Sequence, residues 1–429
     1  MGIIGVVVFA PAFSQEIVSI SKNDVLNKVT NQNLQSKLSN QEIKIAEAEV
    51  LSARASYLPN ISASYTAMGT NNPLMAFGSK LNQANVVMDD FNPVNLNNPS
   101  NIMNYATKIE LQQPIINRDA VYQKKAGLVK IESLKIKKER TIEYLKYEVS
   151  KAYMQLQLAY KAVEVLEGAK VTTLANKKTI DNYFKNGMVQ KSDVLYIDIR
   201  VAEIENQIKY AKSNIQNASD YIYFLMDEES NNKILKPSDF LSHPKKEEEV
   251  IPKINTSRSD IKAYKKSMEV YDLMIKSSKA KRLPRLNAFG SFEIYDNKPY
   301  QFDANGYLVG IQLSWNIFDG LKSKSEQTKL KADLDKLKTE VQQYEKQSQL
   351  ELNKMYRQVN DANNKVSLSQ LSWEQSKEAY RIKKNRFDQG LEKPSDVLNA
   401  ETQMAQKELE YYQSIYEYNS AVEYYQFLK

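Results

Sequence analysis

The sequence contains no cysteine and only one histidine in 429 residues. Without thiols the chain cannot use a cysteine nucleophile, a disulfide, a thiolate metal site or a lipid attached through cysteine. The single histidine, His243, precedes a proline in a polar stretch, which favours a surface position over a metal ligand. A phosphate-binding glycine loop, a paired-histidine motif and a glycine-flanked nucleophilic serine are also missing. The sequence therefore predicts a protein that is not an enzyme and has no cofactor or metal.

Long apolar runs are scarce as well, and the mean hydropathy is −0.56. A membrane-spanning helix needs about 18 apolar residues in a row, and only the short stretch at residues 2–10 is strongly apolar. Small residues at Ala12 and Ser14 precede Gln15 and are typical of a cleavage site, so residues 1–14 are interpreted as a secretory signal. The stretch lacks a basic leading segment, and a buried N-terminal strand is the alternative.

Charge is balanced and interspersed, with 59 Lys and Arg against 52 Asp and Glu. Such mixing is typical of solvated helix faces and does not indicate a nucleic-acid partner.

The most informative feature is an internal repeat. Residues 182–195 recur as residues 385–398 with seven of fourteen positions identical, including the segment Ser-Asp-Val-Leu. Residues 55–59 correspond in the same way to residues 280–284, and residues 109–111 to residues 311–313. A repeat of this length indicates duplication of a structural unit. We expect a first repeat at 15–227, a connector at 228–257 and a second repeat at 258–429.

Each repeat is predicted to contain a helix, a pair of strands, a very long helix, a tight turn and another long helix. Proline is absent between Ile115 and Lys236 and again between Tyr300 and Lys393, which favours helices over 118–187 and 321–390, each on the order of 100 Å long. Apolar residues alternate at spacings of three and four, which is typical of a coiled-coil seam. The seam residues are Ile142, Leu145, Val149, Ala152, Leu156, Ala159, Val163 and Leu166, and in the second repeat Leu352, Met355, Val359, Ala362 and Val366.

Four segments alternate apolar and polar residues with the period of a β-strand. Two readings fit this pattern: an ordinary half-exposed sheet and strands of a transmembrane barrel with a watery interior. Four strands are too few to close a barrel, and an open edge in lipid would leave backbone groups unpaired. If the strands cross a membrane, several chains must share one barrel. The link at 69–104 is rich in Asn and contains three prolines, and it is expected to be an irregular loop. The connector between the repeats is polar and also contains prolines.

On these residues the chain resembles the TolC family of outer-membrane efflux and secretion channels. Leu58-Pro59 and Leu283-Pro284 enter strands, residues 311–320 lead from a strand into a long helix, and both turns match a Gly-(x)5-Asp-Val-Leu pattern. The resemblance implies a mainly helical chain with a small β part. Three chains would form a helical α-barrel and one 12-stranded transmembrane β-barrel, to which each chain gives four strands.

The resemblance also implies a function. The trimer would be a passive exit duct in the outer membrane that extends into the periplasm, serving a tripartite efflux pump or a type I secretion system. A periplasmic adaptor and an inner-membrane pump would open it at its periplasmic tips. The tip residues are Gly187, Met188, Val189, Gly390, Leu391 and Glu392. A structural periplasmic coiled-coil adaptor or scaffold is the alternative function.

Two further sets of residues follow from the resemblance and from the strand pattern. The pore constriction maps to Asp193 and Asp396, whereas Asn399 stands where other members carry an additional aspartate. Both aspartates are also placed to cap the following helix, so capping and pore lining both stay open. The lipid-facing residues are expected to be Ile61, Tyr65, Ile109, Leu111, Phe292, Ile294, Ile311, Leu313 and Trp315, with Ser62, Lys108, Glu293 and Gln312 on the lumen side.

Overall fold

The computed structural model describes residues 16–243 and 253–429. The predicted signal at residues 1–14 therefore lies outside the described residues. The chain forms two compact units, and both draw on both repeats. The helical unit contains the N-terminal segment up to residue 41 together with 136–261 and 342–429. The sheet unit contains 42–135 and 262–341.

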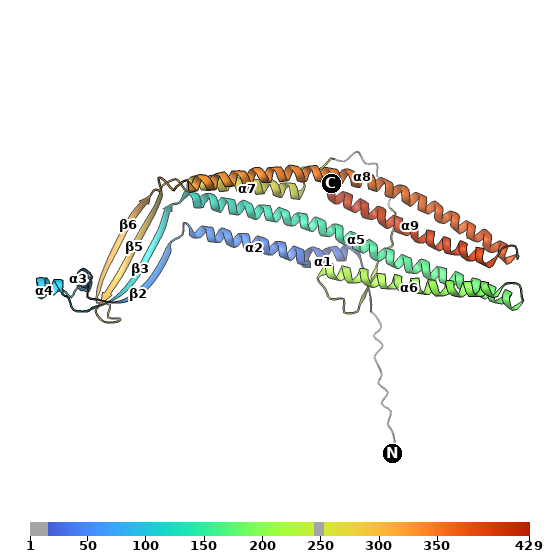
Figure 1. The fold of residues 1–429 in the computed structure, drawn as a ribbon, viewed down its shortest axis with the longest axis horizontal. Helices are drawn as coiled ribbons and strands as arrows, with labels where there is room; N and C mark the ends of the chain where they lie inside the picture. Colours follow the sequence, from blue (N-terminus) through green and yellow to red (C-terminus); the bar gives the residue numbers. More distant parts are fainter. Residues whose placement is uncertain (1–15, 244–252) are drawn as a thin grey trace, which may run out of the picture. The chain divides into compact units, whose positions relative to one another are not determined.

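The helical unit is dominated by two long hairpins (Figure 1). The first joins α5 (Arg118–Lys185) to α6 (Lys191–Met226), and the second joins α8 (Lys322–Asp388) to α9 (Pro394–Leu428). The predicted seam is where these helices are buried, for example at Leu145, Leu156 and Leu352. Among the residues that the structure describes, no helix is both long and apolar enough to cross a membrane.

The first repeat begins with two helices, α1 (Lys22–Gln32) and α2 (Leu34–Ala55), separated at Asn33. Ser21 and Asp24 form a capping box at the start of α1, which satisfies two backbone donors that a helix start would otherwise leave unpaired. Asn33 is buried and donates its side-chain amide to the carbonyl of Leu225, 2.7 Å away. This bond ties the break between the helices to the end of α6.

The connector has a regular element that was not predicted from the sequence. It contains β4 (Ile234–Pro237), which pairs in parallel with β1 (Ile17–Ile20). Leu235 is buried there in the hydrophobic core. The strand was missed because four residues among prolines and charges give too short a pattern to recognise.

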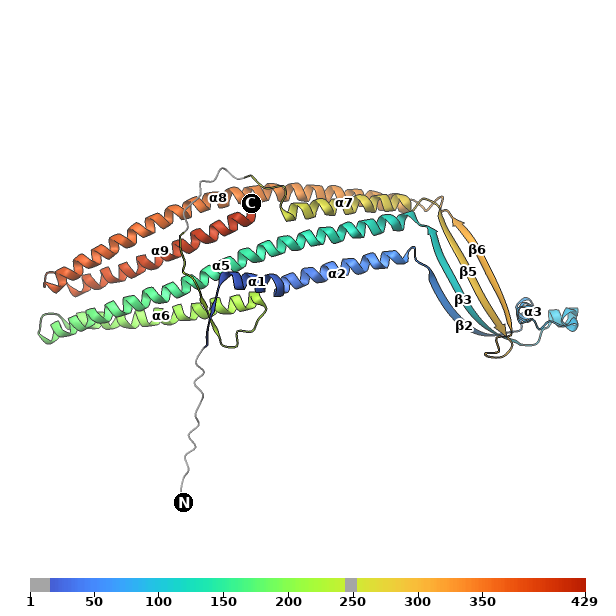
Figure 2. The ribbon, with the colours of Figure 1, turned by 180° about the vertical axis from the view of Figure 1, so that it is seen from behind.

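The sheet unit carries one antiparallel sheet in the order β2-β3-β5-β6 (Figure 2). Its strands are β2 (Asn60–Thr70), β3 (Ile102–Ile116), β5 (Arg285–Asp296) and β6 (Ala304–Ser314). The helix α7 (Ser259–Ala280) precedes β5. Between α2 and α5 a Cβ on Gly127 would come within 2.6 Å of Val50. Only glycine permits this close approach of the two helices.

The link between β2 and β3 was expected to be an irregular loop, and this prediction is wrong. It folds into α3 (Pro73–Asn82), a 3₁₀ turn η1 (Met88–Phe91) and α4 (Pro93–Asn97). Two of the three Asn-Pro pairs in this link are helix starts: Asn72 and Asn92 accept backbone hydrogen bonds while the following proline takes the first helical position. Phe77 and Phe91 pack edge to face with ring centroids 5.6 Å apart.

Candidate functional site

The two hairpins end in turns with the same backbone. Gly187 and Gly390 have φ values of +72° and +74°, a left-handed conformation that favours glycine. In each turn the glycine and the next residue donate backbone hydrogen bonds to the preceding helix: Gly187 to Phe184 at 3.0 Å and Met188 to Tyr183 at 2.8 Å, and likewise Gly390 to Phe387 and Leu391 to Arg386. This is the Schellman motif that ends helices. Each glycine therefore ends its helix at the tight turn.

The side chains of the turns divide into exposed and covered ones. Met188 is 66% exposed and Leu391 is 62% exposed. Val189 and Glu392, the other non-glycine tip residues, are only partly exposed. Val189 packs against a buried apolar cluster, and Glu392 forms ion pairs with Arg386 at 2.9 Å and Lys383 at 3.8 Å.

The apolar cluster beneath the turns joins the two hairpins, and we call it the tip cluster. Its buried members come from all four long helices: Ile180, Ile197, Phe387, Val397 and Leu398. Tyr183 adds an aromatic contact to Phe387 with ring centroids 5.4 Å apart. The cluster packs the ends of the two hairpins against each other, beneath the turns that carry the exposed Met188 and Leu391.

The predicted pore aspartates differ in their local bonds. Asp193 occupies the third position of α6, and its carboxylate accepts a hydrogen bond from the backbone N–H of Gln190 at 2.9 Å. It therefore has a capping role. Asp396 has the same position in α9, where Lys393 precedes the helix and Pro394 begins it. Both side chains are half-buried, and their pore role stays a prediction.

A buried polar layer lies in the same hairpins and was not predicted from the sequence. We define it as Thr173, Asn176, Arg200, Tyr380 and Glu401. Glu401 is 0% exposed and accepts a hydrogen bond from the Thr173 hydroxyl at 2.9 Å. Arg200 is 4.0 Å from the same carboxylate, and Asn176 donates to the Tyr380 hydroxyl at 3.3 Å.

The polar layer is only partly satisfied. One oxygen of Glu401, the Nε of Arg200 and the amide oxygen of Asn176 are buried without a hydrogen-bond partner. Burial raises the pKa of Glu401, against the opposing effects of the Thr173 hydrogen bond and the Arg200 charge. The signal that would have revealed the layer is Glu401 itself, a charged residue at a seam position between Val397 and Ala405.

The strand registers place the predicted lipid-facing residues on one side of the sheet. Ile61 lies opposite Leu111, Ile109 opposite Phe292, and Leu286 opposite Leu313. Because residues paired across an antiparallel ladder share a face, eight of the nine predicted side chains form one apolar face: Ile61, Tyr65, Ile109, Leu111, Phe292, Ile294, Ile311 and Leu313. Trp315 follows the end of β6 and donates its indole N–H to the carbonyl of Arg282 at 3.0 Å.

The opposite face of the sheet carries the predicted lumen residues Ser62, Lys108, Glu293 and Gln312. Lys108 lies 3.2 Å from Glu110 and 3.4 Å from Glu293. Phe289 shares this face and covers Gly310, where a Cβ would come within 2.7 Å of the ring. This face therefore carries charged residues and one apolar contact, between Phe289 and Gly310. The alternation of apolar and polar residues did not predict that contact.

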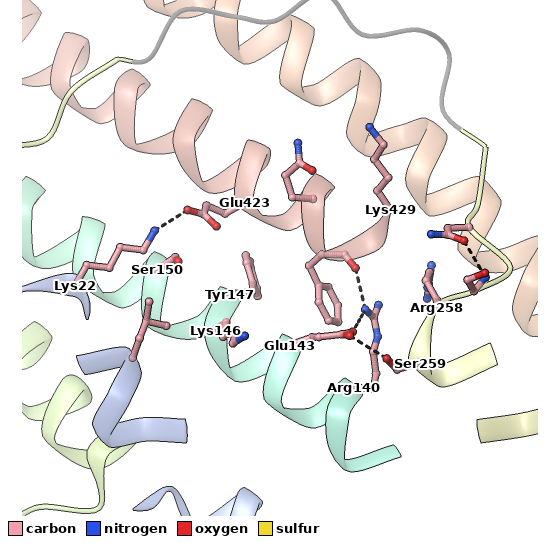
Figure 3. Close-up of a pocket in the computed structure, with 15 residues that line it drawn as sticks. Lys22, Arg140, Glu143, Lys146, Tyr147, Ser150, Arg258, Ser259, Glu423 and Lys429 are labelled. Atoms are coloured by element: carbon pink, nitrogen blue, oxygen red, sulfur yellow. Dashed lines mark hydrogen bonds and ion pairs between the residues drawn. The ribbon is translucent and has the colours of Figure 1, made fainter. Parts of the chain in front are cut away.

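A pocket of about 550 Å³ in the helical unit is lined by several cations (Figure 3). Its arginines are already engaged. Arg140 donates to the carbonyl of Phe427 at 3.0 Å and Arg258 to that of Leu428 at 2.7 Å. These bonds satisfy carbonyls that the end of α9 leaves without a partner in the helix. The pocket is therefore explained by anchoring of a helix end.

Asp260 completes this anchor. Burial alone would raise the pKa of Asp260, but hydrogen bonds from Arg258 and Tyr344, at 2.5 and 2.6 Å, outweigh burial and lower it. Among the described residues, no group of three or more histidine or acidic side chains is placed to hold a metal ion.

Comparisons with known proteins agree with this architecture. Residues 250–424 match the family model of outer membrane efflux proteins. No curated protein matches the sequence significantly. A membrane protein from Pseudomonas aeruginosa has a TM-score of 0.79 at 15% identity, over 95% of this chain and 93% of that one.

Two named channels are similar in the same way. The CmeC outer membrane channel of Campylobacter jejuni has a TM-score of 0.77 at 16% identity, over 95% of this chain and 85% of that one. The open state of the MtrE outer membrane channel of Neisseria gonorrhoeae has a TM-score of 0.75 at 12% identity, over 95% and 88%. Identities this low show the fold. The predicted resemblance and fold class are confirmed: the chain has the fold of outer-membrane channels, and residues 250–424 match the outer membrane efflux protein family.

Proposed function

We propose that three copies of this chain form a passive exit duct through the outer membrane, open to the periplasm at the hairpin turns. The observation that carries the proposal is the sheet, which has one apolar face, one charged face and two outer strands without a partner among the described residues. The apolar face suits lipid and the charged face suits a watery lumen.

Closure of the sheet requires further copies. About eight strands are needed before a barrel encloses its own interior, and the described sheet has four. An open edge in hydrocarbon would leave a row of backbone donors and acceptors unpaired, each at a cost of several kcal/mol. Three chains give enough strands for a barrel with an open interior.

The turns are the proposed docking surface for a periplasmic adaptor, which in turn engages an inner-membrane pump. Met188 and Leu391 are apolar, more than 60% exposed and carried by the two turns above the tip cluster. Apolar residues presented together on a surface indicate a protein partner. The pump supplies the energy, and the duct itself performs no chemistry.

A structural coiled-coil adaptor or scaffold is the competing function. It would use the hairpins but has no need for a duplicated strand pair with one continuous apolar face. Purification distinguishes the two, because a duct requires detergent and a scaffold stays in solution without it.

The sharper test uses two strand positions on opposite faces. Ile109 lies on the apolar face opposite Ala63 and Phe292, and Gln312 lies on the charged face opposite Asn287. An arginine on a lipid-facing side chain near the bilayer midplane costs about 2–4 kcal/mol. We expect Ile109→Arg to reduce the amount of trimer in outer-membrane extracts, measured by mass photometry in detergent, while Gln312→Arg assembles normally. Equal assembly of both variants would contradict the proposal.

A further inference from the structure

Both edges of the sheet and the segment after β6 are uncovered in the part of the single chain that the structure describes. Among the described residues, β2 and β6 have no strand on their outer sides. Trp315 and Phe318, just beyond β6, are 59% and 76% exposed. Large aromatic side chains beside an unpaired strand edge indicate a surface that is covered in the assembled protein.

The duplication predicts the register of the strand that would cover each edge, because the strand pairs of the two repeats have the same register. The first strands of the repeats are offset by 225 residues, from Ala55 to Ala280, and the second strands by 202, from Ile109 to Ile311. These offsets convert the observed pair Asn60 with Gln112 into Arg285 with Ser314, which is the observed register of the second hairpin.

A side-chain bond agrees with the same offsets. In the first repeat Gln113 donates its side-chain amide to the carbonyl of Tyr57 at 3.0 Å. In the second repeat the corresponding residues are Trp315 and Arg282, and the indole N–H donates to that carbonyl at 3.0 Å. The two strand pairs are therefore equivalent in register and in this contact next to the strands.

The repeats meet each other where β3 pairs with β5, with Leu111 opposite Gly290 and Gln112 opposite Phe289. In this pairing, the second strand of one repeat (β3) lies beside the first strand of the next repeat (β5). The second strand of the second repeat is β6, and the first strand of the repeat that would follow it is β2 of another copy. The offsets of 202 and 225 residues therefore convert the pairing of β3 with β5 into a pairing of β6 with β2. We propose that β6 pairs antiparallel with β2 of a second copy of this chain, with Leu313 opposite Tyr65 and Ser314 opposite Ser64. The proposal rests on the proposed trimeric duct and adds its residue register.

The register is consistent with the faces, which were not used to derive it. Leu313 and Tyr65 both lie on the apolar face, and Ser314 and Ser64 both lie on the charged face. A slip of one residue would bring Leu313 opposite a serine or threonine of the charged face and reverse the orientation of every side chain.

The same step accounts for the exposed aromatics. It places Trp315 opposite Ala63 of the second copy. The register of β3 shifts by one residue between Pro114 and Ile116. The equivalent shift after β6 falls between Asn316 and Phe318, so that Ile317 is left unpaired and Phe318 lies opposite Ile61. Trp315 and Phe318 then cover the start of the neighbouring β2. Closure of β6 onto β2 within one chain is excluded, because the two strands are opposite edges of a four-stranded sheet.

Disulfide cross-linking tests the register directly, since the natural chain has no cysteine. Residues directly opposite in an antiparallel pair have Cα atoms about 4.5–5.5 Å apart, within the range of a disulfide. We would make Tyr65→Cys with Leu313→Cys, and Ser64→Cys with Ser314→Cys. The two pairs are adjacent along the ladder, so one of them has the closer, non-hydrogen-bonded spacing. After mild oxidation in detergent, at least one pair should give covalent products of two and three chains on a non-reducing gel.

The matched controls shift one cysteine by two residues on the same face. Ala63→Cys with Leu313→Cys, and Ser62→Cys with Ser314→Cys, displace the sulfurs by about 6.6 Å along the strand, and we expect at least fivefold less product. Gln112→Cys with Phe289→Cys, the equivalent pair inside one chain, serves as the positive control and should close within the monomer.

Failure of the register and failure of the duct give different results. If trimers are present by mass photometry and the internal control closes, but the displaced pairs cross-link better or no pair does, the register is wrong and the duct stands. If the cysteine-free protein forms no trimer in detergent, the duct itself is refuted. Preferred cross-linking of the matched pairs supports the register.

Discussion

The two hairpins have the same backbone and different polar chemistry just beneath their turns. The repeat offset of 203, from Asn182 to Asn385, makes Lys177 and Asp198 of the first hairpin equivalent to Tyr380 and Glu401 of the second. Lys177 and Asp198 form an ion pair at the surface, with side chains 30% and 48% exposed. Tyr380 is half-buried and Glu401 is fully buried.

This difference shows that, at these positions, the second hairpin places its polar side chains in the contact between the hairpins. The polar position of the second hairpin is turned toward the first, where Thr173 and Arg200 approach the carboxylate. The phenylalanines follow the same rule: Phe387 is 2% exposed in the tip cluster, whereas its equivalent Phe184 is 39% exposed. At these positions the second hairpin faces the first, whereas the equivalent residues of the first hairpin are exposed to solvent.

The largest expected effect concerns the exposed residues that the two turns share. Met188→Asp combined with Leu391→Asp places charges on the proposed adaptor surface, and we expect loss of export. Neither side chain is buried, so the stability of the trimer should not change. Susceptibility of the host to toxic export substrates measures function, and the amount of trimer in the outer membrane is measured in the same cells.

Asn186→Asp with Gln389→Asp is the matched control, because these equivalent residues lie in the same turns and are already polar. Normal export by the control is expected. Normal export by the Met188 and Leu391 variant would contradict the docking surface.

The second effect compares the cations of the two hairpins. Arg200→Met removes the only cation that an ion pair of the described residues places beside the buried Glu401, and we expect a loss of about 1–3 kcal/mol. The loss of stability is smaller than that of leaving an ionised carboxylate buried without a partner, because Glu401 can take up a proton and become neutral. Lys177→Met breaks an exposed pair and should cost less than about 1 kcal/mol. Hydrogen exchange of the hairpin ends would measure both, and equal losses would contradict the assigned difference.

The sequence was sufficient to predict the repeat, the long helices, the seam and the strand faces, because each depends on a pattern repeated over many residues. Leu145, Leu156 and Leu352 were predicted on the seam and are buried. The sequence was insufficient for β4, since its partner strand β1 lies far away in the chain. It was also insufficient for α3, since the Asn72-Pro73 pair that starts this short helix is equally typical of a loop. Glu401 was missed for a related reason: burial of one charged residue depends on which side of a hairpin faces its neighbour, and both repeats share one pattern.

The third effect is pH dependence confined to one hairpin. Burial holds the pKa of Glu401 above the ordinary 4.5, so the unfolded chain ionises this group at lower pH than the folded one. Stability from this group is therefore greatest below pH 4.5 and decreases as pH rises through the folded pKa. The groups around it are Arg200 from α6 and Tyr380 from α8.

Glu401→Gln should keep the Thr173 hydrogen bond and remove this decrease, whereas Asp198→Asn should leave it unchanged. Hydrogen exchange of α9 near residue 401 between pH 4 and pH 7 is the measurement. A pH dependence that persists in Glu401→Gln would assign it to another group.

The smallest effect concerns the two aspartates of the repeated Ser-Asp-Val-Leu segment. Asp193→Asn with Asp396→Asn preserves side-chain oxygens, so Gln190 can still donate to position 193 and the helix start is retained. In the proposed trimer each aspartate occurs three times, and a ring of carboxylates in a narrow pore attracts cations. Asn399 removes one such ring. We therefore expect a modest decrease in cation selectivity, measured as the reversal potential across a planar bilayer in a salt gradient, with no change in thermal stability.

Asp193→Ala separates the two roles: it should cost about 1 kcal/mol by loss of the cap, whereas Asp396→Ala should cost less because no backbone donor is bonded to its carboxylate among the described contacts of α9. An unchanged reversal potential in the double Asn variant would leave capping as the role of Asp193 and would remove the pore role from both residues.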